Sequence, residues 1–176
     1  MAEDGRFFAY EFLVEGLAGG STVLRMVASG FIPGDDWADE FEAMGKGLDL
    51  FFRTLATYLT HFTGRVGTPI TIFGPPVGDW REIWANVREA LGLGDAAGVG
   101  DPARFTVHGQ VIEGTVYSAN SQTIGIRTAD SLYRFMQGFH GSLVLGHAVF
   151  STKDTTEIER SWQAWLSELP TNGGNS

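Results

Sequence analysis

The stretch RFTVHGQVIEGTVYSANSQTIGIRTADSLYRFMQGFHGSLVLGHAVFSTKDTTEIERSWQAWLSEL, from Arg104 to Leu169, decides the fold. Short β-rich runs are separated by glycine, asparagine and aspartate, a pattern typical of strands joined by tight turns. From Ile158 onward the apolar side chains recur at three- and four-residue spacing instead, as on one face of a helix. The stretch therefore predicts an antiparallel meander followed by a C-terminal helix. The expected strands are Arg104–His108, Val111–Ala119, Gln122–Thr128, Leu132–Phe139 and Ser142–Ser151, and the helix begins at Thr155 or Thr156.

Two further elements precede the meander. Asp79 is placed to cap a helix from Trp80 to about Leu91 that carries its apolar residues on one side. Before it, Pro69 to Phe73 is a brief expected strand, which the sequence Gly74-Pro75-Pro76 is expected to end. A unit boundary is expected near Gly67, in the connector before that strand.

The N-terminal part predicts a hairpin and a long helix. Phe7 to Glu15 and Ser21 to Ser29 are the expected strands, with the glycine-rich turn GLAGG between them. Asp35 or Asp36 is placed to cap the helix, which buries one apolar stripe through to about Phe62. Two glycines, Gly45 and Gly47, are positions at which this helix is expected to be interrupted.

The two ends of the chain form a weak internal repeat of strand, glycine turn, strand and amphipathic helix. Aligning Ser21 with Ser142 brings Val23 onto Val144. This suggests a partial unit at residues 1–66, a compact unit at 67–170 and a disordered tail at 171–176. A hairpin with one helix is marginal alone, so we expect it to extend a sheet, within the chain or across a homodimer. An N-terminal segment missing before Met1 is the remaining alternative.

Composition excludes several classes of protein. The 12 basic and 21 acidic side chains give a formal charge of −9, which argues against nucleic acid and anionic membranes as partners. There is no cysteine, so disulfides and thiolate chemistry are absent. The N-terminus MAEDGR lacks the features of an export signal, and no apolar run is long enough for a membrane span. We therefore expect a cytoplasmic protein.

At the level of motifs, the first unit resembles a known family. The residues that carry the resemblance are STVL at Ser21–Leu24, Ser29-Gly30-Phe31, Trp37, Gly47-Leu48 and LATYLTHF at Leu55–Phe62. They are similar to the C-terminal third of bacterial proteins of the Activator of Hsp90 ATPase homologue 1-like family, in the START-like (SRPBCC) superfamily. The family often has Gly-Trp where this chain has Gly47-Leu48, and the strands and helices that should precede the first unit are missing. The second unit resembles a compact START-like domain.

The resemblance implies an α+β, helix-grip fold, in which a curved antiparallel sheet packs on a long C-terminal helix around a hydrophobic cavity. It also implies candidate ligand-binding residues. Alternation along the strand places His147 on the same face as Leu143, Leu145 and Val149, where its imidazole would be either a polar handle for a ligand or a core histidine bonded to the backbone. The full candidate set is Tyr117, Phe135, His147, Trp162 and Trp165 as pocket lining, with Arg127 for an anionic group.

Three functions follow from these observations. The first is non-catalytic binding of a small hydrophobic or amphipathic ligand, and the second is a protein-interaction module with a chaperone or other protein partner, as in Hsp90 co-activators. The third is a cyclase- or hydrolase-like START enzyme, for which Glu113 and His147 are the pair to test. The four histidines are scattered, and the acidic residues at 35–42 lack the spacing of a calcium loop. No catalytic residue, metal ion or cofactor is therefore assigned.

Overall fold

The structure is a computed structural model that describes residues 9–29, 38–138, 141–151 and 155–170. Its contacts divide the chain into two compact units, Met1–Glu42 and Ala43–Ser176. This division differs from the boundary expected near Gly67, because most of the first helix packs within the second unit. The predicted tail at 171–176 and the expected helix cap at Asp35 or Asp36 lie outside the described residues.

The first unit contains the predicted hairpin, in which β1 (Ala9–Gly16) pairs with β2 (Thr22–Ser29). The register places Phe12 opposite Met26 and Val14 opposite Leu24, so one face of the hairpin is apolar while Glu11 and Arg25 lie on the other. The two strands form a sheet of their own. Among the described residues, therefore, the hairpin does not extend the larger sheet within the chain. Pairing across a homodimer stays a prediction.

The helix α1 (Ala38–His61) continues without a break through Gly45 and Gly47, where an interruption was expected. Neither glycine has a neighbour that a Cβ atom would meet, and glycine inside a helix costs only about 1 kcal/mol relative to alanine. Leu50 in the second half of the helix, and Phe62 directly after the helix ends, are buried in a cluster with Leu132 of the sheet. Tertiary packing of the second half of the helix thus outweighs the low helix propensity of the two glycines.

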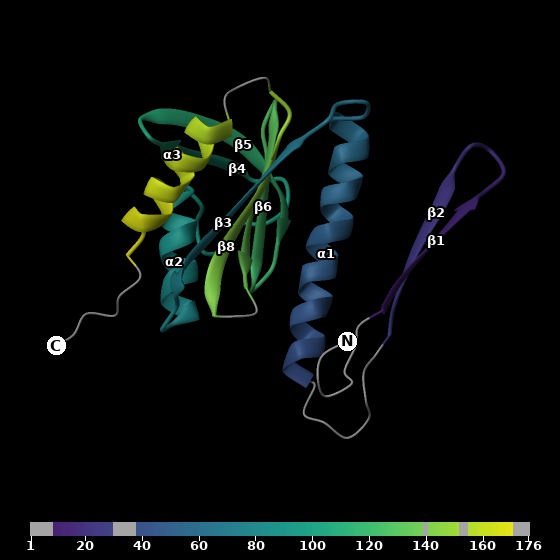
Figure 1. The fold of residues 1–176 in the computed structure, drawn as a ribbon, viewed down its shortest axis with the longest axis horizontal. Coiled ribbons are helices and arrows are strands. Elements are labelled where there is room, and N and C mark those ends of the chain that lie inside the picture. The colour runs from purple at the N-terminus through teal and green to yellow at the C-terminus, as the bar shows by residue number, and fades with distance from the viewer. Residues whose placement is uncertain (1–8, 30–37, 139–140, 152–154, 171–176) are drawn as a thin grey trace. The chain divides into compact units, whose positions relative to one another are not determined.

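The second unit is built on a six-stranded antiparallel sheet in the order β3-β8-β7-β6-β5-β4 (Figure 1). The meander from β4 to β8 is confirmed, and β3 returns to the edge of the sheet beside β8. This edge strand runs past its expected end at Phe73 through to Pro76, with a register irregularity on the way. An edge strand tolerates proline because one side of it needs no hydrogen-bonded partner. The strands are β3 (Thr68–Pro76), β4 (Pro102–Val107), β5 (Gln110–Ala119), β6 (Thr123–Arg127), β7 (Ser131–Gln137) and β8 (Ser142–Val149).

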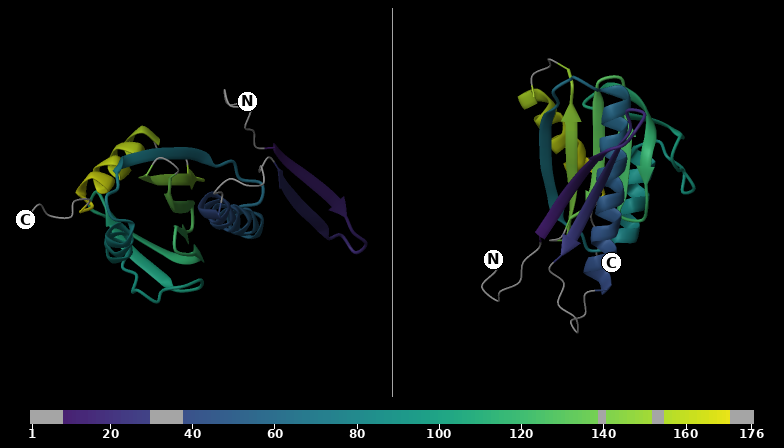
Figure 2. Two further views of the ribbon diagram at one scale, coloured as in Figure 1. Left: turned by 90° about the horizontal axis from the view of Figure 1, so that it is seen from below. Right: turned by 90° about the vertical axis from the view of Figure 1, so that its right-hand side faces the viewer.

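Two helices cover the concave face of the sheet, and α1 lies on its convex face (Figures 1 and 2). The helix α2 (Trp80–Ala90) and the C-terminal α3 (Thr155–Glu168) bury their apolar sides against the concave face in one large core. The predicted α+β, helix-grip fold is confirmed by this arrangement of curved sheet and C-terminal helix. None of the helices in the described part of the chain is both long and apolar enough to span a bilayer.

Candidate functional site: a cavity at the end of the helix-grip core

A cavity of about 210 Å³ opens where the ends of β4, β7 and β8 meet the first half of α3. Polar and apolar side chains share its wall, and the charged groups among them are carboxylates. The residues around it are Val107, His108, Gln110, Ile112, Asp130, Ser131, Tyr133, Val149, Ser151, Glu157, Ile158, Ser161 and Trp162. An engineered protein cavity of about 150 Å³ is known to hold benzene, so this volume suits a molecule of one or two rings.

The turn between β4 and β5 supplies one side of the cavity. Val107 pairs with Gln110, leaving His108 and Gly109 as a two-residue hairpin loop. Both loop residues have positive φ, 48° and 77°, as a type I′ turn requires. His108 is the one non-glycine residue with positive φ in the described part of the chain. An imidazole is therefore held at the cavity in a conformation that L-residues seldom adopt.

The turn between β6 and β7 supplies the opposite side. The hydroxyl groups of Thr128 and Ser131 donate to Oδ1 of Asp130, at 3.2 and 3.1 Å, and fix its carboxylate. The backbone carbonyl of Asp130 accepts from Phe150 N at 2.8 Å, which ties the turn to the end of β8. Two residues on, Tyr133 is buried and its pKa is raised above 10, mainly by desolvation; a hydrogen bond with Ser131 opposes this rise and the charge of Asp130 adds to it. The phenol is therefore neutral at physiological pH.

The helix α3 closes the cavity with residues one turn apart. Ile158 and Trp162 give it an apolar wall, and Glu157 and Ser161 add oxygen atoms beside that wall. The hydroxyl group of Ser161 donates to the carbonyl of Glu157 at 2.9 Å, so its oxygen still has lone pairs available. Across the cavity, Ser151 Oγ is buried and has no hydrogen-bond partner among the described residues. The site thus presents acceptors around a small apolar volume.

His147 lies deeper, in the core next to this cavity. Its ring is fully buried, with its centroid 4.4 Å from that of Trp162 and 5.0 Å from that of Tyr133. Nδ1 accepts a hydrogen bond from the backbone N of Arg134 at 3.2 Å, whereas the buried Nε2 has no partner among the described residues. Desolvation, with the charge of Arg134 as a second cause, lowers the pKa of His147 to about 3. The histidine is therefore a neutral core residue bonded to the backbone.

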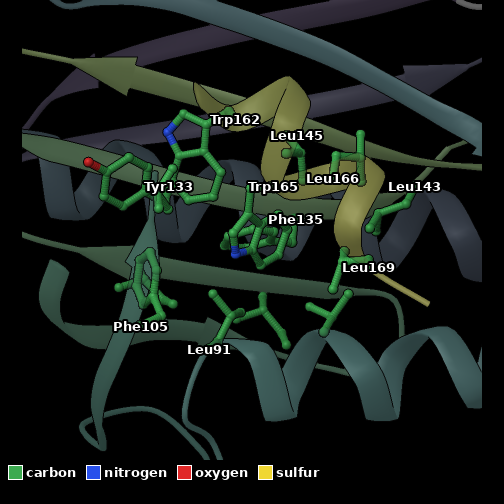
Figure 3. Packing of buried hydrophobic residues seen from close by; sticks show 14 of the residues in the cluster. Leu91, Phe105, Tyr133, Phe135, Leu143, Leu145, Trp162, Trp165, Leu166 and Leu169 are labelled. Carbon is green, nitrogen blue, oxygen red and sulfur yellow. The ribbon is translucent and has the colours of Figure 1, made fainter. Parts of the chain in front are cut away.

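Four of the candidate residues are brought together by the fold in the core between sheet and helix; Figure 3 shows three of them, Phe135, Trp162 and Trp165. Phe135, His147, Trp162 and Trp165 contact one another at centroid separations of 4.4–5.8 Å. Of these, Trp162 also reaches the 210 Å³ cavity, while Trp165 borders a separate hollow beside α2. Aromatic side chains thus occupy the space where the family resemblance implies a deep hydrophobic cavity, and the 210 Å³ cavity lies at the end of this core.

The other two candidates lie on the convex face. Tyr117 is buried beneath α1, where its hydroxyl group is 2.9 Å from Thr54 Oγ1, and burial raises its pKa to about 12. Arg127 pairs in register with Leu132, which packs in the convex cluster. On β5, Ile112 and Val116 belong to the concave core, so the alternation of side chains places Tyr117 on the convex side. The expectation that Tyr117 lines a pocket between sheet and helix was therefore wrong, and Arg127, the candidate for an anionic group, lies on the convex face as well.

The pair considered for catalysis does not meet. Glu113 is exposed on β5 and forms a surface ion pair with Arg104 at 3.4 Å, whereas His147 is enclosed in the concave core. A general base and its partner must be within hydrogen-bond reach, directly or through one water molecule. The hypothesis that Glu113 and His147 act together is inconsistent with this geometry.

Sequence reasoning missed the polar lining of the cavity. His108 was expected to end a strand but lies in the β4–β5 turn, and Asp130 and Ser131 lie where the sequence marks only a break between strands. A signal was nonetheless present, because His108 precedes Gly109 in the two-residue spacing of a type I′ turn, in which asparagine or aspartate is usual. Glu157 and Ser161 lie one turn apart on α3, but their helical spacing alone does not indicate what they face.

The fold is a helix-grip fold, and its cavity lies where the ends of β4, β7 and β8 meet α3. No family model and no curated protein sequence matches the chain. Among solved structures it is similar to the crystal structure of the di-domain ARO/CYC BexL from the BE-7585A biosynthetic pathway, with 14% sequence identity and a TM-score of 0.32. The match covers 92% of this chain but 63% of that one, so the chain spans less than two thirds of its length. A likeness at this TM-score carries no argument about ligand or activity.

Proposed function

We propose that this protein is a non-catalytic binder of a small amphipathic molecule, held in the cavity between the sheet ends and α3. The single observation that carries the proposal is the cavity of about 210 Å³, whose lining combines the apolar side chains of Ile158 and Trp162 with the hydroxyl and carboxylate groups of Ser131, Asp130 and Ser161. Concave sites that combine apolar surface with placed polar groups are where proteins bind small ligands.

The lining also defines the chemistry of the ligand. Its charged groups are Asp130 and Glu157, and neither arginine nor lysine lines the cavity in the part of the chain that the structure describes. Hydroxyl groups and carboxylates accept hydrogen bonds, so a ligand with hydroxyl or N–H donors fits. A carboxylate repels an anionic group placed beside it. The ligand class is therefore a neutral or cationic molecule of one or two rings that carries donors.

Non-catalytic binding is favoured by the roles that the polar groups already have. Asp130 is held by Thr128 and Ser131 as part of a turn, and His147 is a neutral histidine whose Nδ1 satisfies a backbone amide. Groups fixed in this way orient a ligand well, because their geometry is set before binding. They do not form the sequence of nucleophile, base and orienting group that covalent catalysis needs.

The test is an NMR titration of the full chain with indole, a neutral two-ring donor, compared with the anion indole-3-carboxylate. We expect indole to shift amide resonances at 107–112, 130–133 and 157–162, and the carboxylate to bind more weakly. Replacing Ser161→Phe should fill the cavity and abolish the indole shifts. The matched control is Ser167→Phe, since Ser167 lies exposed on the same helix with the same hydrogen bond to the carbonyl four residues before it. Indole shifts that persist in Ser161→Phe would refute the proposal.

A further inference from the structure

The convex side of the sheet carries a second concavity, separate from the cavity under α3. It lies in the second unit between α1 and strands β7 and β8, with a volume of about 460 Å³. Its wall is mainly apolar and includes two arginines but no acidic residue. The residues around this groove are Phe51, Thr54, Leu55, Tyr58, Arg65, Val66, Gly67, Leu132, Arg134, Ala148 and Phe150.

Arg134 lies on the floor of the groove. Its Nε donates to the carbonyl of Gly146 on the neighbouring strand β8, which fixes the guanidinium group at the sheet. The positive charge of Arg134 lowers the pKa of Tyr117 and also that of His147 on the other side of the sheet. Nη1 and Nη2 have no carboxylate partner among the described residues.

Arg65 lies at the rim of the groove and is held in place by neutral groups. Its Nη2 donates to the carbonyl of Phe150 at 2.6 Å, and its guanidinium carbon lies 5.4 and 5.7 Å from the ring centroids of Phe62 and Phe150. The hydroxyl group of Tyr58 donates to the backbone carbonyl of Arg65 at 3.0 Å and fixes the segment. In the described part of the chain Arg65, too, has no ion-pair partner.

Among the described residues, neither of the two arginines of this mainly apolar groove has a carboxylate partner, although the chain has 21 acidic side chains against 12 basic ones. Of the two, Arg134 is half-buried and Arg65 is exposed. A half-buried guanidinium group is stabilised when an anion accepts its remaining hydrogens, since charge-assisted hydrogen bonds are among the strongest in proteins. The apolar walls require that the rest of the occupant be apolar.

We propose that this groove binds a small molecule with a carboxylate and an apolar body, the carboxylate meeting Arg134 and Arg65 and the body lying against Leu55, Leu132 and Ala148. This site is independent of the cavity under α3 and has the opposite preference for charge. The same protein would thus hold a neutral or cationic donor on its concave side and an amphipathic carboxylate on its convex side.

The experiment is an NMR titration of the full chain with octanoate, with octanamide as its neutral analogue. We expect octanoate to shift amides at 54–58, 65–67, 132–134 and 148–150, and to bind roughly tenfold more tightly than octanamide, as one charge-assisted contact allows. Arg134→Gln and Arg65→Gln should each weaken octanoate by about tenfold. Arg127→Gln is the matched control, because Arg127 shares the convex face without lining the groove.

A second variant keeps the test decisive if Arg134→Gln fails to fold, since Arg134 also bonds Gly146. Ala148→Leu should fill the floor of the groove and abolish octanoate binding while both arginines remain. Ser161→Phe, which blocks the other cavity, should leave octanoate binding unchanged. The proposals for the two sites are therefore tested independently. Equal binding of octanoate and octanamide, shifts confined to 107–112 and 157–162, or no binding at all would each overturn the proposal.

Discussion

At the scale of single residues, His147 connects the stability of the core to pH. The folded state holds this imidazole neutral with a pKa of about 3, whereas an imidazole in the unfolded chain has a pKa of about 6.5. Between these two values the unfolded chain binds a proton that the folded chain does not bind. The contribution of the histidine to stability is therefore complete above about pH 6.5 and is lost as pH falls toward 3.

This linkage predicts a difference between the wild type and His147→Asn, in which an amide oxygen can still accept from Arg134 N but no group titrates. As pH falls below 6.5, the free energy of unfolding of the wild type should decline more steeply, by up to about 1.4 kcal/mol per pH unit. Urea denaturation at a series of pH values measures both curves. Parallel curves across this window would show that the imidazole is not buried as described.

Trp162 should be the most costly aromatic residue to remove. It is 1% exposed and contacts Phe105, Tyr133, Phe135 and Trp165 as well as His147. Trp162→Ala should lower the free energy of unfolding by about 3–5 kcal/mol, since it leaves a large void among rigid rings. Trp165→Ala, with fewer ring contacts, should lie at the lower end of that range, and the partly buried Trp80 serves as the control. A loss for Trp162→Ala no larger than that for Trp80→Ala, by chemical denaturation, would contradict the packing.

Sequence reasoning found most of the core aromatics but not the vacant space beside them. Helical spacing on α3 and alternation on β7 and β8 predict that Phe135, His147 and Trp162 meet, and they do. Alternation was not followed for Tyr117, since Ile112 and Val116 of β5 belong to the concave core and the residue after Val116 must lie on the convex side. Whether buried rings line a cavity or fill it depends on packing to within a few tenths of an ångström, which no residue pattern encodes.

At the scale of elements, the N-terminus of α2 shows a local signal that sequence predicts well. Asp79 was expected as the cap, and its Oδ1 accepts from the backbone N of Arg81 at 2.8 Å and of Glu82 at 3.4 Å. Asp79→Ala should therefore lower the free energy of unfolding by about 1 kcal/mol, and Asp79→Asn by much less, since asparagine caps nearly as well. Thermal or urea denaturation of the two variants measures this difference. Equal losses would mean that the cap hydrogen bonds do not stabilise the helix.

Other elements departed from expectation where tertiary structure overrides a local preference. Gly45 and Gly47 weaken α1 locally, yet the helix is continuous because its second half packs on the sheet. Pro75 and Pro76 were expected to end β3, but an edge strand accommodates them. Both cases require knowledge of neighbours far away in the chain, which propensity alone does not include.

At the scale of the whole molecule, the second unit has three layers, with α2 and α3 on one face of the sheet and α1 on the other (Figure 2). The order of strands and helices was predictable, because turn residues punctuate each strand and the helices carry one apolar face. The sequence did not predict which face of the sheet is concave. It also did not predict that the cavity under α3 is lined by carboxylates and the groove on the convex side by arginines. Asp130 and Glu157 come from the sheet end and α3, whereas Arg65 and Arg134 meet on the convex side only after folding.

The central claim is that the cavity under α3 holds a small molecule. Native mass spectrometry of the full chain purified from its host tests it most directly, with Ser161→Phe and Ser167→Phe prepared in parallel. The account predicts a bound small molecule that is released on unfolding, is retained by Ser167→Phe and is absent from Ser161→Phe. A bare protein mass in every preparation, or a bound mass that Ser161→Phe retains, would contradict it.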